Sequence, residues 1–214
     1  MIWDLNDRQR EIIEAALELL KEKGYNDLSM RDIAKKLNVK APAIYWHFEN
    51  KTALVDYMAE YILRKGMGDF SPRENEQSWQ DWLVCHISLF RKAMLSYPDG
   101  GRVVVGAHLF PVVTLARLMD YSIASLCSAG IEIRVARSIA QTVIHYTFGY
   151  VIEEQSDRRD HSTMPSHVMD IVEIKNLMEV RNTGGTNDEN FLSGLELIIA
   201  NKSFGGKERC PSEG

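Results

Sequence analysis

The chain has 214 residues, of which 45% are hydrophobic and 26% charged, as expected for one or two globular domains with a sizeable core. Its formal net charge of −5 excludes a protein that coats nucleic acid over its whole surface, so any DNA contact must be local. The three cysteines are too few and too far apart for a disulfide framework or a zinc site. With no signal peptide and no apolar run long enough to span a bilayer, we expect a cytoplasmic protein without membrane contact.

The first predicted element is an amphipathic helix at residues 7–23. Asp7 is placed to cap its start, aliphatic side chains recur along one face, and Gly24 is a natural helix stop. The first turns are acidic, which suits the helix dipole but does not suit contact with phosphate. We therefore expect this helix to support the element that follows it.

Residues 28–51 predict a helix, a tight turn and a second short helix. Ser29 and Asp32 have the spacing of a capping box at the start of the first helix. Asn38 tolerates the left-handed backbone that often ends a helix, and Pro42 suits the first turn of the next one. A helix, a short turn and a second helix is the arrangement that many DNA-binding proteins use to read a major groove.

The charge and the aromatic content of this segment bear on that interpretation. Residues 27–51 contain five lysines and arginines against three acidic side chains, in a chain that is acidic as a whole. Ile44 and Phe48 are four residues apart and can face inward together, which leaves the other aromatic side chains for a partner. A local basic surface favours phosphate contact, but an ordinary helical hairpin with all its aromatic side chains in the core fits the spacing as well.

The rest of the chain also predicts helices. A linking helix begins at Lys51 and ends near residue 67, which makes a lever of roughly 25 Å. Glycines and a proline after it mark a domain boundary. Further helices are predicted at residues 78–97, 112–129, 132–155, 169–180 and 189–201, with a turn at 98–101, a short apolar segment at 103–109 and loops at 156–167 and 182–187.

Several motifs along the chain resemble those of the tetracycline-repressor family. They are YWHFENK at residues 45–51, SWQDWL at 78–83, FRKAMLS at 90–96, HYTFGYVIE at 145–153 and GLELII at 194–199. The resemblance extends to about residue 202. It implies an all-α fold, in which residues 1–67 form a three-helix helix-turn-helix DNA-binding domain with its linking helix. Residues 68–202 would form a helical ligand-binding and dimerisation domain. Residues 203–214 are polar and contain glycines, a composition that predicts a disordered tail.

The resemblance also implies which residues contact DNA. They are Arg31, Ala41, Pro42, Ala43, Tyr45, Trp46, His47 and Lys51. The family pattern has a glutamine and a threonine where this chain has Ala41 and Ala43, and alanine can only touch a thymine methyl group. We therefore expect a different operator, with Arg31 as the main hydrogen-bonding reader of bases and Lys51 among the phosphate contacts.

The residues that the resemblance places around a ligand tunnel lie in the second domain. They are His86, Phe90, Val104, Ala107, His108, Ser122, His145 and Glu153. His145 and Glu153 are eight residues apart, so they lie roughly 80° apart around a helix and could face one cavity. For each histidine taken alone, an ordinary core or surface role is the favoured interpretation.

Val104 stands where the family's metal-ligating histidine is expected, and an alkyl side chain cannot coordinate a hard cation. The sequence therefore predicts no protein metal site and no obligatory cofactor. It argues against a magnesium-chelated tetracycline. We expect a small polycyclic or aromatic inducer, bound mainly by apolar contacts with a few polar anchors.

The two late helices, at residues 132–155 and 189–201, carry many apolar side chains. Burial within one chain would explain them, whereas the resemblance implies a four-helix interface of a homodimer. A dimer could read the two half-sites of a palindromic operator about 34–36 Å apart. An inducer would release double-stranded DNA by favouring another subunit arrangement, with residues 106–111 as the moving segment.

Two other functions compete with a repressor. The sequence has no nucleophile elbow, no HExxH motif and no phosphate-binding loop, so we expect that it is not an enzyme. The alternative that the two alanines keep open is a ligand-binding or scaffold protein whose DNA-binding domain is degenerate. A gel shift with the DNA that flanks its own gene distinguishes the two.

Overall fold

The computed structural model describes residues 5–74, 76–109, 111–157 and 185–200, and all regular structure within them is helical. The elements are α1 (Asp7–Lys23), α2 (Met30–Lys36), α3 (Ala41–Tyr45), α4 (Lys51–Met67), α5 (Trp79–Leu95), α6 (Gly100–Val105), α7 (Val113–Ser128), α8 (Ile133–Asp157) and α11 (Asn187–Ile199). The predicted all-α fold class is confirmed. The predicted helix at 169–180 and the tail at 203–214 lie outside the described residues.

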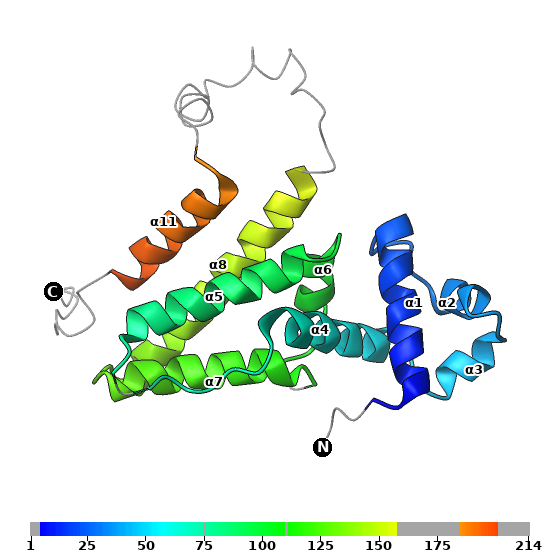
Figure 1. Ribbon diagram of the computed structural model, residues 1–214, viewed down its shortest axis with the longest axis horizontal. Coiled ribbons are helices and arrows are strands. Elements are labelled where there is room, and N and C mark those ends of the chain that lie inside the picture. Colours follow the sequence, from blue (N-terminus) through cyan, green and yellow to red (C-terminus); the bar gives the residue numbers. More distant parts are fainter. Residues whose placement is uncertain (1–4, 75, 110, 158–184, 201–214) are drawn as a thin grey trace, which may run out of the picture.

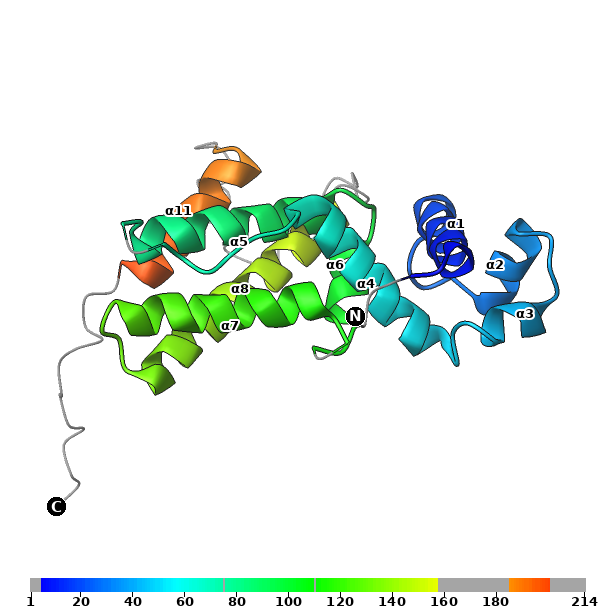
Figure 2. The ribbon, with the colours of Figure 1, turned by 60° about the horizontal axis from the view of Figure 1, so that its bottom comes forward.

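The helices form two groups that α4 joins. Figure 1 shows α1–α3 gathered at one end, and α5, α7 and α8 packed side by side at the other. In Figure 2 the linking helix α4 descends from this bundle to the small three-helix group, and α11 lies against the outside of α5 and α8. Among the helices of the described ranges, none combines the length and the hydropathy that crossing a membrane requires.

The three-helix group is built from local signals that the sequence carries. The apolar face of α1 is buried, and Gly24 ends the helix with a φ of 81°. Asn6 caps the helix, not Asp7, since its side chain accepts the Gln9 N–H in a complete capping box. The prediction of Asp7 as the cap was therefore wrong by one residue.

The start of α2 and the turn after it follow the predicted pattern more closely. Ser29 caps the helix by accepting the Asp32 N–H, and the Asp32 carboxylate accepts the Ser29 hydroxyl at 2.7 Å. This hydroxyl contact lowers the pKa of Asp32, and an ion pair with Lys23 at 3.1 Å lowers it further. Asn38 has a φ of 54°, the left-handed conformation expected of a helix stop.

The linking helix α4 packs closely on the bundle at one point. A Cβ atom on Gly66 would lie 2.4 Å from the Cβ atom of Ala93 on α5, so only glycine lets the two backbones approach this far. The apolar side chains of α4 are buried along its length. Because α4 carries buried surface into both groups, a shift of α4 moves the three-helix group relative to the bundle.

The turn predicted at residues 98–101 is present at Pro98 and Asp99, but its second half is the start of α6, which begins at Gly100 after a left-handed Asp99 with a φ of 59°. Gln155 of α8 stabilises this arrangement from far away in the sequence. Its side-chain amide donates to the carbonyl oxygen of Tyr97 at 2.8 Å and accepts the Gly101 N–H at 3.1 Å. Local propensity could not reveal a helix start that depends on a side chain 54 residues away.

Most of the apolar side chains on the two late helices are buried within the single chain. Phe191, Leu195 and Val151 are at most 1% exposed, whereas Leu197 is 76% exposed. Arg91 of α5 holds α11 in place, since its guanidinium pairs with Asp188 of α11 and with Glu154 of α8. Burial within the chain therefore accounts for much of this surface, and the homodimer stays a prediction.

Candidate DNA-binding surface and ligand site

The short helix α3 has an inner face that anchors it and an outer face that is free to meet a partner. Ile44 is fully buried and Phe48 is 1% exposed, and the Phe48 ring packs edge-on against Tyr57 of α4 at 5.2 Å. Trp46, in contrast, is 87% exposed and Tyr45 is 49% exposed. The interpretation in which every aromatic side chain belongs to the core is therefore wrong.

All eight residues predicted to contact DNA lie on the surface of the three-helix group or at its border with α4. The exposed ones are Arg31, Pro42, Tyr45 and Trp46, and the partly exposed ones are Ala41, Ala43, His47 and Lys51. Arg31 of α2 and Ala41 of α3 line one open hollow of about 470 Å³. The predicted base reader Arg31 and Ala41, the first residue of α3, therefore lie at the same hollow.

Lys35 and Lys40 line the same hollow, although sequence analysis did not name them as contacts. The excess of basic residues in the segment 27–51 includes Lys35 and Lys40, and it was the signal that could have identified them as DNA contacts. Lys36 faces the other way, because its ammonium pairs with Glu22 at 2.9 Å and Glu18 at 3.1 Å on α1. These contacts, that to Glu22 first, raise the pKa of Lys36. The hollow therefore has a positive rim that suits phosphate oxygens.

Lys51 is held at the start of α4. Its ammonium donates to the carbonyl oxygen of Tyr25 at 3.4 Å and lies 5.3 Å from the centre of the Tyr25 ring. Asn50 caps the helix by accepting the Ala53 N–H at 2.8 Å. The positive end of the α4 dipole adds to the charge of Lys51, and such a helix start is a favourable place for a phosphate.

The eight residues predicted around a ligand lie in three different environments. Phe90, Val104 and Ser122 are at most 1% exposed. His86 and Ala107 are partly exposed, and His108, His145 and Glu153 are exposed. The described residues do not bring all eight around one space, so the membership of this site stays a prediction.

His86 belongs to an aromatic cluster that we define as Phe70, Trp82, His86 and Tyr121. The imidazole stacks on the Trp82 ring at 4.1 Å, and Phe70 lies 5.4 Å from His86 and 5.8 Å from Tyr121. Nδ1 of His86 lies 2.7 Å from the Trp82 carbonyl oxygen. Flat aromatic faces with one polar anchor are what an aromatic ligand requires.

His108 has a different environment from that predicted. Its backbone N–H donates to the Asp56 carboxylate at 2.8 Å, and its Nδ1 lies 3.2 Å from the same carboxylate. Its side chain is 67% exposed. His108 therefore ties the segment after α6 to the linking helix, a role that sequence analysis did not assign to it.

A second carboxylate of α4 makes a similar connection one helical turn further on. Glu60 accepts both the backbone N–H and the hydroxyl of Thr114, each at 2.8 Å, at the start of α7. Glu60 is 3% exposed, and this burial raises its pKa. Sequence analysis missed both carboxylates, although two acidic residues four apart on the apolar face of α4 were a visible signal.

The described residues around Val104 do not fit a protein-bound metal ion. Val104, at the position of the expected metal-ligating histidine, is 1% exposed and offers only carbon atoms. Within the part of the chain that the structure describes, no three His, Cys, Asp or Glu side chains lie close enough to hold one ion.

Comparisons with known proteins agree for both halves of the chain. Residues 12–58 match the family described as bacterial regulatory proteins, tetR family. Residues 71–201 match the family described as tetracyclin repressor-like, C-terminal domain. The class C tetracycline repressor protein of Escherichia coli is 34% identical over 208 residues, which cover 91% of this chain and 90% of that protein.

Two solved structures are similar over most of their length. One is a Q116A variant of TetR from Acinetobacter baumannii AYE in complex with minocycline, with a TM-score of 0.73 and 32% identity over 98% of this chain and 100% of that one. The other is class A TetR in complex with 5a,6-anhydrotetracycline and magnesium, with a TM-score of 0.65 and 29% identity over 88% of this chain and 94% of that one.

Proposed function

The chain belongs to the TetR family of bacterial regulatory proteins, and from this membership we propose that it is a ligand-responsive repressor. It binds a palindromic operator as a homodimer, and a small aromatic or polycyclic inducer releases it. Regulators of this family are not enzymes, and this chain is not one. The observation that carries the proposal is the outward face of the helix-turn-helix, where exposed aromatic side chains adjoin a basic hollow.

The chemistry of this face supports a role in reading DNA. Arg31 offers a planar guanidinium that can donate two hydrogen bonds to a guanine edge. Lys35, Lys40 and Lys51 provide charge for the phosphates on either side. Ala41 and Ala43 keep the start of α3 small, so the backbone can approach a thymine methyl group closely.

The ligand domain supports an inducer that binds without an obligatory metal ion. The relatives with solved complexes are bound to minocycline or to anhydrotetracycline with magnesium. In this chain Val104 provides no ligand for such a cation. The aromatic cluster around His86 favours a flat organic molecule whose affinity comes mainly from apolar contact.

The polar contacts of α4 provide a route from ligand to DNA. Asp56 holds the segment after α6, and Glu60 holds the start of α7. An inducer that favours another position of this segment therefore moves α4, and with it Lys51 and the three-helix group. The inducer can shift the equilibrium only by as much as its affinities for the two arrangements differ.

Fluorescence anisotropy with a labelled duplex from the region upstream of the gene tests this function. We expect saturable binding that random DNA of the same length does not match, and its loss when an inducer is added. Tetracycline is added with and without magnesium. Tight binding that requires magnesium would contradict the proposed metal-free site. Indifference to every duplex from the genomic neighbourhood would favour the scaffold alternative.

A further inference from the structure

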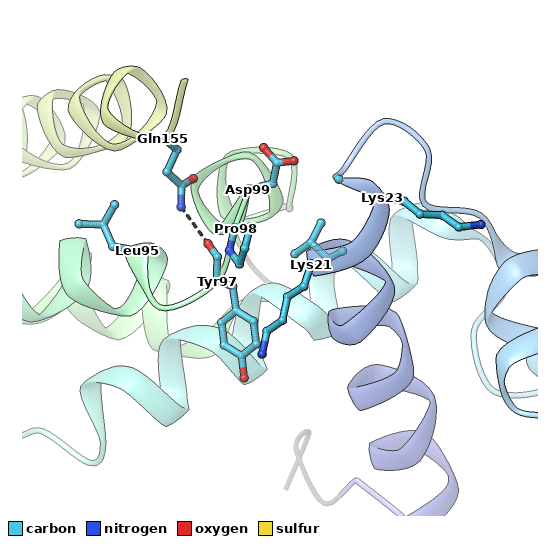
Figure 3. A pocket seen from close by; sticks show the side chains of 9 residues that line it. Lys21, Lys23, Leu95, Tyr97, Pro98, Asp99 and Gln155 are labelled. Carbon is cyan, nitrogen blue, oxygen red and sulfur yellow. Dashed lines mark hydrogen bonds between the residues drawn. The ribbon is translucent and has the colours of Figure 1, made fainter. Parts of the chain in front are cut away.

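A cavity of about 450 Å³ lies between the DNA-binding domain and the ligand domain, away from the aromatic cluster. The end of α1 forms one wall, and the turn between α5 and α6 forms the other. Figure 3 shows the two walls facing each other, with Gln155 of α8 above Tyr97. Small-molecule sites commonly occur at such domain boundaries, and they commonly have volumes of about 300–1,000 Å³.

The walls of this cavity are fixed by hydrogen bonds. Gln155 holds the α5–α6 turn through the carbonyl oxygens of Tyr97, at 2.8 Å, and Met94, at 3.3 Å. The Asp99 carboxylate accepts the Tyr25 N–H at 2.9 Å, which joins the two walls directly. The cavity is therefore formed before a ligand arrives, so binding does not need to order its walls first.

The charges at the cavity favour an anion. The ammonium group of Lys21 lies 5.1 Å from the centre of the Tyr97 ring, and Figure 3 shows the side chain extending along the cavity toward that ring. Lys23 points away from the cavity in the same view, and it pairs with Asp32 at 3.1 Å. Nε of Arg102 lies 3.6 Å from Asp99 and offsets its negative charge. Lys21 is thus the cation that the cavity presents to a ligand.

The remaining surface of the cavity is largely apolar. Leu20 is fully buried, Leu95 is partly buried, and Tyr97 is 9% exposed. Leu20 has no accessible surface of its own, so Tyr97 and Leu95 provide the apolar surface beside the ammonium group of Lys21. We propose that this cavity binds a small aromatic monocarboxylate, with its carboxylate on Lys21 and its ring against Tyr97 and Leu95.

This site is separate from the site predicted for the inducer, since none of its lining residues belongs to the predicted set of eight. Because both domains line it, an occupant senses their relative position. Binding of this ligand does not require that the chain recognises an operator or an inducer. The proposal therefore stands or falls independently of the proposed function.

Isothermal titration of the full chain with 2-naphthoate tests the site. We expect saturable binding with a Kd of about 1 mM or tighter, as befits a ligand of this size with one charged contact. Lys21→Gln should weaken binding by about tenfold or more, because it removes a charge-assisted hydrogen bond. The unaltered chain should bind the neutral 2-naphthamide about tenfold or more weakly than it binds 2-naphthoate.

Two control variants locate the site. Lys92→Gln changes an exposed lysine elsewhere on α5, and Lys40→Gln tests the hollow at the DNA-binding surface. Both should bind 2-naphthoate as the unaltered chain does. The proposal is overturned if no saturable binding is found up to about 10 mM, a range well above the expected Kd. The proposal is also overturned if Lys21→Gln binds 2-naphthoate as tightly as the unaltered chain does, or if the amide binds as tightly as the carboxylate. A loss of 2-naphthoate binding in either control variant would overturn it as well.

Discussion

The two domains use their charged side chains in opposite ways. In the helix-turn-helix the buried face is apolar, and the charges of Arg31, Lys35 and Lys40 stand at the surface. In the ligand domain a few charged groups are buried and connect helices, as Arg91 does between α5, α8 and α11. The DNA-reading surface can therefore change without changing the fold, whereas the ligand domain depends on its buried polar connections for its shape.

Loss of Arg91 should have the largest effect. Arg91 and Glu154 are each 3% exposed at the side chain and pair at 2.7 Å, and the guanidinium lies 4.9 Å from the Phe191 ring. Arg91→Ala removes the guanidinium from a buried ion pair, which should lower the free energy of unfolding by about 3–5 kcal/mol. Urea denaturation followed by circular dichroism measures this loss.

A matched double variant separates the charge from the packing. Arg91→Met with Glu154→Leu removes both charges and keeps apolar volume, so it should recover most of the lost free energy of unfolding. If the double variant were as unstable as Arg91→Ala, the buried charge would not be the cause, and the contrast between the two domains would weaken.

Substitutions at the DNA-binding surface should change recognition and leave stability alone. Arg31→Ala should reduce discrimination between operator and random DNA by about 1–3 kcal/mol, since it removes hydrogen bonds to base edges. Lys51→Ala should weaken binding to all sequences alike and reduce the slope of log K against log salt by about 0.9, the share of one phosphate contact. Anisotropy titrations over a series of salt concentrations measure both. Equal losses for Arg31→Ala on operator and random DNA would contradict its role as a base reader.

The same contrast explains how much of the molecule could be predicted from its sequence. Signals that lie within a few residues, such as Ser29 before α2 or Gly24 after α1, placed the helices to within about two residues at most boundaries. Contacts that join distant segments could not be predicted in this way. The spacing of Asp56 and Glu60 on α4 indicates two carboxylates on an apolar face, but it does not reveal that they bind His108 and Thr114, which are 52 and 54 residues away.

The candidate sites follow the same division. Trp46 and Phe48 lie just after α3, and Phe48 is four residues from the buried Ile44, so the inner and outer faces of this segment were predictable. The position of a side chain around a ligand depends on how long helices pack against each other. His145 and Glu153 share a helix, as predicted, but both are exposed. Helical spacing fixes which residues share a face, and tertiary packing decides what that face meets.

A carboxylate of the linking helix and one of the helix-turn-helix should respond to pH in opposite directions. Burial raises the pKa of Glu60 above 4.5, so its contribution to stability is greatest below pH 4.5 and declines as the pH rises through the raised pKa. Hydrogen bonding lowers the pKa of Asp32 below 3.8, so its contribution is present above that pH and is lost as the pH falls through the lowered pKa.

Urea denaturation of Glu60→Gln and Asp32→Asn across a pH series measures these contributions. As the pH rises, the free energy of unfolding of Glu60→Gln should increase relative to that of the unaltered chain. The free energy of unfolding of Asp32→Asn should decrease relative to it. If the two differences had the same sign of pH dependence, the buried and the exposed carboxylate would not differ as the structure indicates.

Trp46→Ala should have the smallest effect on stability. Its side chain is 87% exposed, so its removal should change the free energy of unfolding by no more than about 0.5 kcal/mol. The operator affinity should nevertheless fall severalfold, because the indole lies on the surface that we propose meets DNA. Ile133→Ala is the matched control, since Ile133 is 64% exposed at the start of α8, and it should change neither quantity. Unchanged operator affinity in Trp46→Ala would place the DNA contact elsewhere, and a large loss of stability would mean that the indole packs against the protein. Only a loss of affinity at constant stability fits a surface whose function is separate from the fold.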